Sequence, residues 1–234
     1  QIINRRAIGV GWVVAFPQPD RFGGDFQFSR ALASSPSVLA MFENDNGEYP
    51  PTTGTVILGE DQGGIAAQGV IQNIQILKQN ASQGIAVART EVDSLVRRLP
   101  LLLRTPDGWV PAYGTEVLKV LTGADTYVIK TNENGLEQIR VKGLPPVSVD
   151  SLGRKWVSWV DTPQTDLKEI DVEGKFVFIG FTAKGIMPQL ATPVGLLEPH
   201  KIQAALAESI LIENSPYVPD YALAVEVGLF FISV

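Results

Sequence analysis

Residues 7–16 read AIGVGWVVAF and residues 176–181 read FVFIGF, and neither stretch contains a charged side chain. A strand in a parallel sheet is covered on both faces, so it is typically a continuous apolar run rather than an alternation of apolar and polar residues. Residues 37–41 and 84–88 have the same character over shorter lengths. Together these runs predict a buried sheet that is largely parallel.

Segments with helical spacing separate the apolar runs. Apolar residues recur at intervals of three and four, which predicts helices, over residues 25–33, 113–121 and 202–212 and in a segment that ends near Asn80. Further short strands are expected at residues 55–58, 95–103 and 154–160.

A hairpin interrupts this alternation. Residues 126–130 and 138–141 flank the pair Asn134-Gly135, and both residue types tolerate the positive φ of a tight turn. The sequence therefore predicts an α/β fold: a mixed, largely parallel sheet with helices on both faces and an inserted antiparallel hairpin region. No internal repeat or linker is visible, so we expect one folded domain over residues 1–218.

The composition excludes several classes of protein. The chain has 234 residues with 19 basic and 25 acidic side chains, a net charge of −6. It contains no cysteine and a single histidine, which excludes disulfides, thiolate nucleophiles and two-histidine zinc motifs. The acidic balance and the lack of a basic run argue against a nucleic-acid partner. We also expect no metal and no cofactor, because no motif for either is present.

The last residues are strongly apolar. Residues 221–234 read YALAVEVGLFFISV, and Glu226 is their only charge. Because a membrane-spanning helix needs about 20 apolar residues, we expect residues 219–234 to be the start of a truncated transmembrane helix. A C-terminal core helix is the alternative. The chain begins with Gln1 rather than methionine, which is typical of a piece of a longer protein.

Two segments near the end of the chain are candidates for ligand binding. Residues 180–185, GFTAKG, directly follow a predicted buried strand, so their backbone can form a cradle for an anion or a small ligand. A tight turn is the structural alternative. Thr182 belongs to this loop, whereas Thr192 either caps a turn or faces a pocket. His200 is expected at the start of a helix, and neither a P-loop nor a G-x-S-x-G motif is present.

A charged, glycine-containing loop is a further candidate. Asp20 and Arg21 begin the sequence DRFGGD of residues 20–25, after the first predicted strand. The loop lacks the alternating oxygen ligands and the closing glutamate of a calcium loop, so we do not expect a metal there.

A second charged group lies in the middle of the chain. Asp93 precedes Arg97 by one helical turn's spacing, and Arg98 follows directly. If residues 95–103 form a strand, the two arginines point to opposite faces, and Asp93 is a partner for the one that points inward. The group is either a salt-bridged turn or an anion-binding arginine.

Several motifs occur in an order that resembles one known family. They are AIGVGWVVAF with PDRFGGD, then VDSLVRRLPLL, GKFVFIGFTAKG and ATPVG, and finally the helix IQAALAESIL. Together they resemble the type-two CHASE domain, a cyclase- and histidine-kinase-associated extracellular sensing domain. The resemblance covers the chain from about residue 7 to about residue 212.

The resemblance implies an extracytoplasmic sensor region of a bacterial membrane receptor, followed by transmembrane helices and by a cyclase, a histidine kinase or a protein kinase. It implies a homodimer, because such catalytic domains work in pairs, and it defines no ligand. The family has an upstream strand and helix that are missing here. It also commonly has an aspartate where this chain has Gly11 and a glycine where it has Ser94.

We therefore expect a non-catalytic sensor domain, extracellular or periplasmic, that binds an unknown small molecule or protein and couples it to a cytoplasmic cyclase or kinase. A soluble or periplasmic α/β enzyme of hydrolase type and a ligand-independent dimerisation module are the alternatives. The residues expected to bind the ligand lie in loops or at strand ends: Asp20, Arg21, Asp93, Arg97, Thr182 and Thr192.

Overall fold

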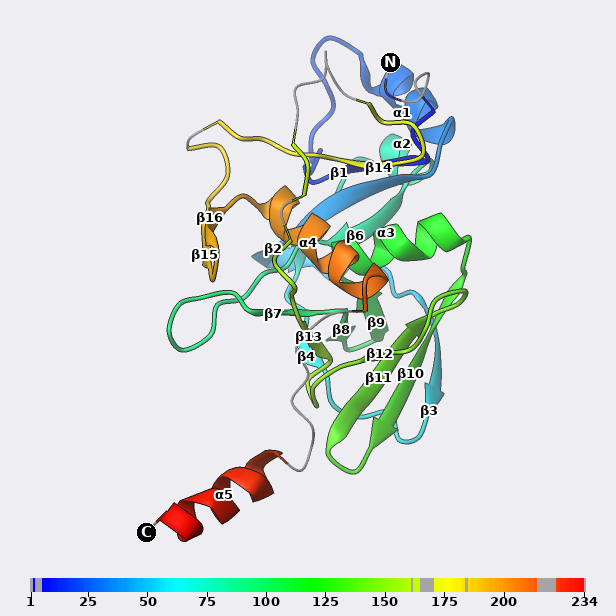
Figure 1. The fold of residues 1–234 in the computed structure, drawn as a ribbon. Helices are drawn as coiled ribbons and strands as arrows, with labels where there is room; N and C mark the ends of the chain where they lie inside the picture. The colour runs from blue at the N-terminus through cyan, green and yellow to red at the C-terminus, as the bar shows by residue number, and fades with distance from the viewer. Residues whose placement is uncertain are drawn as a thin grey trace.

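The computed structural model describes residues 2, 6–160, 162–164, 171–183, 185–213 and 222–233. Its helices are α1 (Asp25–Ala33), α2 (Gln75–Lys78), α3 (Tyr113–Thr122), α4 (Pro199–Leu211) and α5 (Ala222–Ser233). The first strands are β1 (Gly9–Trp12), β2 (Ser37–Glu48), β3 (Gly54–Leu58), β4 (Ile65–Ala66), β5 (Val70–Ile71), β6 (Ser82–Ile85), β7 (Arg98–Pro100) and β8 (Leu102–Thr105). The others are β9 (Gly108–Pro111), β10 (Thr126–Asn132), β11 (Gly135–Val141), β12 (Val147–Ser148), β13 (Arg154–Trp156), β14 (Phe176–Ile179), β15 (Leu190–Thr192) and β16 (Gly195–Leu197). Figure 1 shows a layered body and, apart from it, α5.

The first sheet contains the apolar runs. β14, β1, β2 and β6 are parallel neighbours in that order, and β5 pairs with β2 in the antiparallel direction. Val38 and Leu39 of β2 are both completely buried, although successive side chains of a strand point to opposite faces. The prediction of a largely parallel sheet that is covered on both faces is confirmed.

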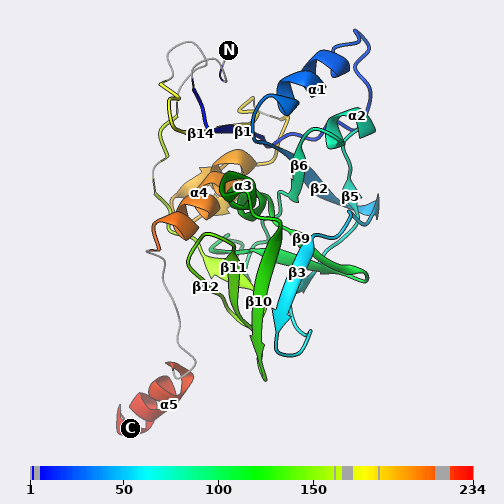
Figure 2. The ribbon, with the colours of Figure 1, turned by 90° about the vertical axis from the view of Figure 1, so that its right-hand side faces the viewer.

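Helices provide this cover. On one face Val38 packs in a cluster with Tyr113 of α3. On the other face Leu39 packs with Leu32 of α1 and Leu77 of α2. Figures 1 and 2 show α3 and α4 on one side of the sheet and α1 and α2 on the other.

A second sheet lies beyond α3 and α4. β10 and β11 form the predicted antiparallel hairpin, β12 pairs with β11, and β3 lies parallel to β10. Tyr127 and Ile129 of β10 belong to the same core cluster as Leu118 of α3 and Leu206 of α4. The two helices therefore form a layer between two sheets, as Figure 2 shows.

Some predicted strands differ in extent. The strand expected at residues 95–103 is divided into β7 and β8, because the chain changes partner at Leu101. The N–H of Leu101 donates to the carbonyl of Gly153, beside β13, and its own carbonyl accepts from the N–H of Ala112, beyond β9. The strands expected at residues 7–16 and 154–160 are shorter in the structure, where they are β1 and β13.

The hairpin turn is also placed one residue earlier than the Asn-Gly pair predicts. Asn132 and Gly135 are cross-strand partners, so Glu133 and Asn134 form the turn. The side chain of Asn132 accepts a hydrogen bond from the N–H of Asn134 at 2.8 Å, which stabilises this alternative. Gly135 follows the turn with φ of 124°, a conformation that favours glycine.

The contact between β6 and α3 generates a stability prediction. A Cβ atom on Gly84 would lie 2.6 Å from Cα and 3.0 Å from N of Tyr113, and these backbone atoms cannot move without displacing α3. Gly84→Ala should therefore lower the free energy of unfolding by about 1–3 kcal/mol, measured by urea denaturation. Gly228→Ala is the matched control, because no atom lies within 4 Å of the added methyl group. Equal stability of the two variants would contradict the close packing of β6 on α3.

Candidate functional site

The parallel strands of the first sheet end at one edge. The N–H of Val13 donates to the carbonyl of Ile179 at 2.8 Å, so the chain leaves β1 and β14 side by side. In Figure 1 the loops that follow β6 and β14 extend toward the left of the body, and the loop that follows β1 rises toward its top. Asp20, Asp93 and Thr182 lie in these three loops. Because ligands of open α/β sheets bind at the carboxyl ends of strands, this edge is the candidate site.

A cavity of about 470 Å³ lies in the loop that follows β14. This volume is within the range of about 300–1,000 Å³ that is usual for small-molecule pockets. Phe181, Ile186, Met187 and Pro188 supply apolar groups, and Thr182, Gln189 and Glu198 supply polar ones. Of the residues predicted to bind a ligand, Thr182 lines this cavity.

Glu198 is the charged group among the described residues that line the cavity, and only 8% of the residue is exposed. Its Oε1 accepts a hydrogen bond from Nε2 of Gln189 at 2.9 Å, and its Oε2 lies 2.8 Å from Nζ of Lys201. Burial opposes ionisation, but the Lys201 ammonium and the Gln189 amide outweigh it and lower the pKa of Glu198 to about 2. Glu198 therefore remains a carboxylate at neutral pH.

The same residue begins α4. Glu198 is the N-cap, with an extended backbone, and Pro199 occupies the first helical turn, where its missing N–H is no loss. His200 follows, as predicted for the start of a helix, and burial lowers the pKa of its imidazole. The ring stands directly against Gly180 at the end of β14, in space that any larger side chain would need. Because Gly180 has no side chain, the start of α4 can lie close to the loop that lines the cavity.

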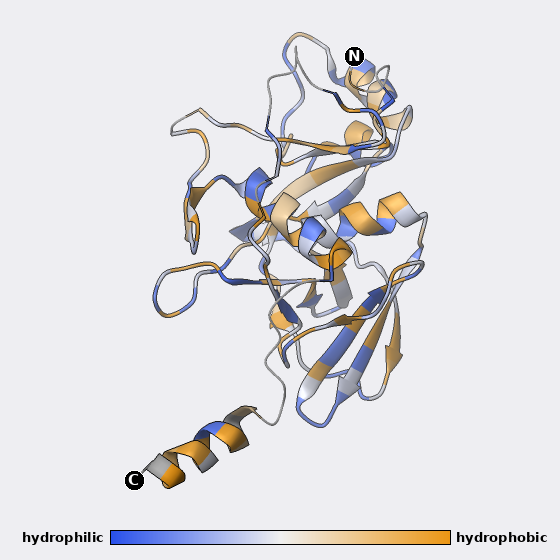
Figure 3. Ribbon diagram, in the orientation of Figure 1, coloured by the Kyte–Doolittle hydropathy of each residue, from blue (hydrophilic) through white to orange (hydrophobic). Residues whose placement is uncertain are grey.

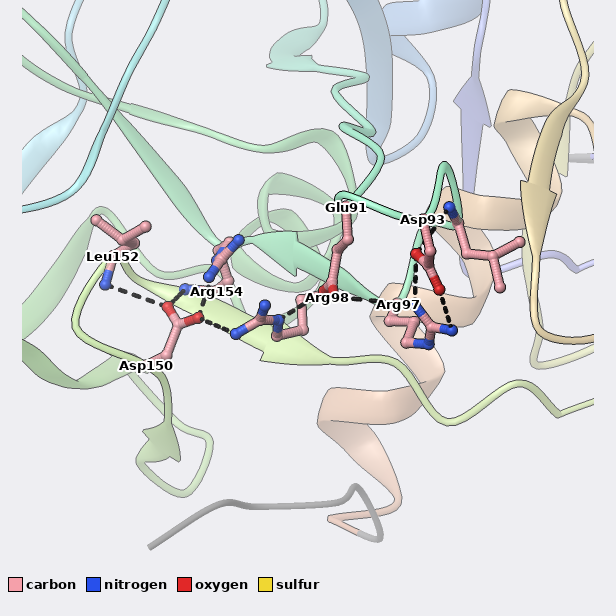
Figure 4. A network of polar contacts seen from close by, with 8 residues as sticks. Glu91, Asp93, Arg97, Arg98, Asp150, Leu152 and Arg154 are labelled. Atoms are coloured by element: carbon pink, nitrogen blue, oxygen red, sulfur yellow. Dashed lines mark hydrogen bonds and ion pairs between the residues drawn. The ribbon is translucent and has the colours of Figure 1, made fainter. Parts of the chain in front are cut away.

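The loop after β6 carries a chain of ion pairs, drawn in Figure 4. Glu91 accepts from Nε of Arg98 at 2.7 Å, and Arg98 also contacts Asp150 at 3.1 Å. Asp150 in turn binds Nε of Arg154 at 2.8 Å. The Arg98 guanidinium lies over the ring of Trp156, 5.2 Å from its centroid, so these contacts attach the loop to the β7–β13 pair.

Asp93 and Arg97 form an ion pair, in which Nη2 of Arg97 lies 2.6 Å from Oδ2 of Asp93. The hydrogen bond from Arg97 lowers the pKa of Asp93. The expectation that Arg97 and Arg98 project from opposite faces of one strand is wrong, because β7 begins only at Arg98. Both arginines form ion pairs with Glu91: Nη1 of Arg97 lies 3.9 Å from Oε2, and Nε of Arg98 lies 2.7 Å from Oε1. The group therefore has the form of a salt-bridged turn.

The other predicted residues lie in separate turns. The carboxylate of Asp20 accepts from the N–H groups of Phe22 and Gly24, which closes the loop before α1, and Arg21 is exposed in the same loop. Thr192 is buried and donates its hydroxyl hydrogen to the carbonyl of Gly195 at 2.7 Å. Its observed role is to cap the β15–β16 turn.

The two departures from the family pattern have local explanations. A side chain at Gly11 would collide with the hydroxyl of Tyr113 and the ring of Phe176, so an aspartate does not fit there. Ser94 has φ of 66°, in the left-handed region that glycine adopts most readily. The Asp93–Arg97 turn thus keeps the backbone shape of a glycine-containing turn.

The sequence reasoning missed the polar wall made by Gln189, Glu198 and Lys201. One available signal was Glu198-Pro199, because proline is favoured at the first position of a helix and places the start of α4 before residue 202. Within the described residues, no three or more histidine, aspartate or glutamate side chains gather in a way that could hold a metal ion.

Comparison with known families agrees with the fold and the order of the motifs. The model of the CHASE2 domain matches residues 2–233. The chain belongs to the CHASE2 domain family. CHASE2 domains are extracellular sensory domains of signalling proteins, and they are sensory rather than catalytic units. No curated protein and no solved structure matches the chain.

Glu198 should make the stability of this CHASE2 domain depend on pH. Its folded pKa of about 2 lies below the ordinary value of 4.5, so its stabilising contribution is complete above about pH 4.5 and is lost as the pH falls toward about 2. Urea denaturation should find Glu198→Gln less stable than the native chain near about pH 6, with the difference closing near about pH 2–3.

Glu173→Gln is the control for this measurement, because Glu173 is an exposed carboxylate whose partner, Arg6, is also exposed. It should follow the native chain at every pH. A stability difference for Glu198→Gln that stays constant across the acid range would show that its carboxylate is not held in the ionised form.

Proposed function

We propose that this CHASE2 domain senses a small ligand in the cavity beside β14 and passes the change through α4 to a membrane segment and a cytoplasmic cyclase or kinase. One observation carries the proposal: Glu198 both lines the cavity and occupies the N-cap position of α4. Among the described residues, the helix that begins at the cavity is also the one that precedes α5. A ligand therefore touches the element that leads out of the domain.

α4 is suited to transmit a displacement. Its 13 residues form a rod of about 20 Å, and most of them are buried between the two sheets. Packed helices shift as rigid bodies, so a change at one end reaches the other. The ligand has to favour one of two positions of α4, because equal binding to both would not alter the output.

α5 supports a membrane-proximal role for the C-terminal segment. Val225, Leu229, Phe230 and Ile232 are all at least half exposed, and Figure 3 colours this helix as largely hydrophobic. The helix has 12 residues, and none of the described helices has both the length and the apolar character that a membrane span requires. We propose that α5 enters the lipid and that two copies of the receptor act as a homodimer.

The location can be tested with single cysteines, because the chain contains none. Val92 is fully exposed at the tip of the loop after β6, so Val92→Cys should react with a membrane-impermeant maleimide on intact cells. Leu229→Cys should react poorly, because lipid would cover α5. Labelling of Val92→Cys only after lysis would contradict the extracellular location, and rapid labelling of Leu229→Cys would contradict membrane insertion.

The sensing role can be tested by filling the cavity in the complete receptor. Met187→Trp should change the cyclase or kinase output at least about threefold, which corresponds to about 0.7 kcal/mol between the two signalling states. Leu58→Trp is the control, because Leu58 is an exposed residue of β3 in the other sheet and does not line the cavity. Equal outputs for the two variants would contradict sensing at this cavity.

A further inference from the structure

We infer that the cavity beside β14 binds an organic cation: a small ammonium compound with an apolar body. The inference rests on the proposed sensing role of the same cavity and adds the class of ligand. It follows from what the lining groups are able to do. Among the described residues, the polar groups of the lining include one carboxylate and two groups that can accept hydrogen bonds, and the other side chains form an apolar wall.

Glu198 has acceptor capacity that the protein does not use. A carboxylate offers about four lone-pair positions. The amide of Gln189 occupies one on Oε1. The Lys201 ammonium is the ion-pair partner of the buried Oε2, at 2.8 Å, although no well-aligned hydrogen bond reaches this oxygen from the described residues. Because Glu198 lines the cavity, the ammonium group of a ligand can form an ion pair with its carboxylate.

The other polar groups of the cavity favour the same ligand. Gln189 donates its amide N–H to Glu198, and its amide oxygen is then the group that remains to accept a hydrogen bond from a ligand. The hydroxyl of Thr182 can also accept. No lining residue that the structure describes carries a positive charge. An anionic ligand would lie against the Glu198 carboxylate, whereas a cation meets a group of opposite charge and two groups that can accept its hydrogen bonds.

The apolar wall selects the body of the ligand. Phe181 and Ile186 line the cavity, yet about half of each side chain surface is exposed, so a bound apolar group would remove this surface from water. An aromatic ring also attracts a cation that lies over its face. The net charge of −6 favours the approach of cations over that of anions.

The proposal predicts that substitutions of Lys201 and Glu198 change the binding of the ligand in opposite directions. The Lys201 ammonium competes with the ligand for the Glu198 carboxylate, so Lys201→Met should strengthen the binding of an organic cation, whereas Glu198→Gln should weaken it. If the pair has only a structural role, breaking it from either side should have the same effect on binding. The opposite directions therefore separate recognition of a cation from a general loosening of the first turn of α4.

The experiment compares three probes of one size on the whole chain by isothermal titration calorimetry: phenylethylammonium, phenylethanol and phenylpropanoate. Phenylethylammonium should bind with a dissociation constant at least about 10-fold lower than that of either other probe. Glu198→Gln should remove this preference, and Lys201→Met should lower the dissociation constant for phenylethylammonium about threefold or more. Thermal unfolding of both variants checks that they remain folded at the temperature of the titration.

Other outcomes overturn the inference and leave the proposed function separately testable. Equal binding of the three probes, a preference for phenylpropanoate, or no binding of any probe would each reject the organic cation as the ligand class. If phenylpropanoate binds and Met187→Trp removes that binding, the cavity is a ligand site for a different class. The output of Met187→Trp in the complete receptor then decides the sensing role independently of the probes.

Discussion

The close approach of α3 to the elements on either side of it is the constraint on which the architecture depends. Gly84 lets β6 lie against the start of α3, and Gly114 lets α4 lie against the same turn, where a Cβ atom would be 2.9 Å from the carbonyl oxygen of Gln203. The buried amide of Gln203 then accepts from the N–H of Gly114 at 3.1 Å and donates to the carbonyl of Val87 at 3.0 Å. Because a buried amide needs partners for both of its ends, these bonds set the position of α4 against α3 and against the loop after β6.

Much of this layer structure could be predicted, because a strand that is buried on both faces is a continuous apolar run in the sequence. β1 and β14 are apolar throughout and β2 is largely apolar over its first six residues, and the pattern of α3 is regular enough to give its bounds nearly to the residue. The division of residues 95–103 into β7 and β8 could not be predicted, because it depends on which partners lie beside Leu101. Local sequence carries no information about a partner that is supplied by a distant segment.

The candidate site was predictable only in part, for the same reason. Thr182 lines the cavity, and its place at the edge of the sheet could be predicted because it follows a buried strand. The role of Thr192 depends on whether its hydroxyl meets a pocket or a carbonyl, and the chain places it on the carbonyl of Gly195. Glu198 was missed because its place in the cavity wall depends on its contacts with two residues. Gln189 lies in the loop after β14, and Lys201 lies in the first turn of α4.

The two ends of the carboxyl edge differ in the side-chain contacts that hold them, and under the proposed function this difference bears on where a ligand acts. The loop after β6 is tied down by the ion pairs of Glu91 and Arg98 and by the contact of Val87 with Gln203. The described residues of the loop after β14 are mostly exposed, and the cavity opens among them. Ligand-binding segments come from the less stable parts of a fold, because binding has to change their state. α4 contacts both ends, at Glu198 and at Gln203, so a ligand that orders the open loop would act on a helix whose other contacts are already fixed.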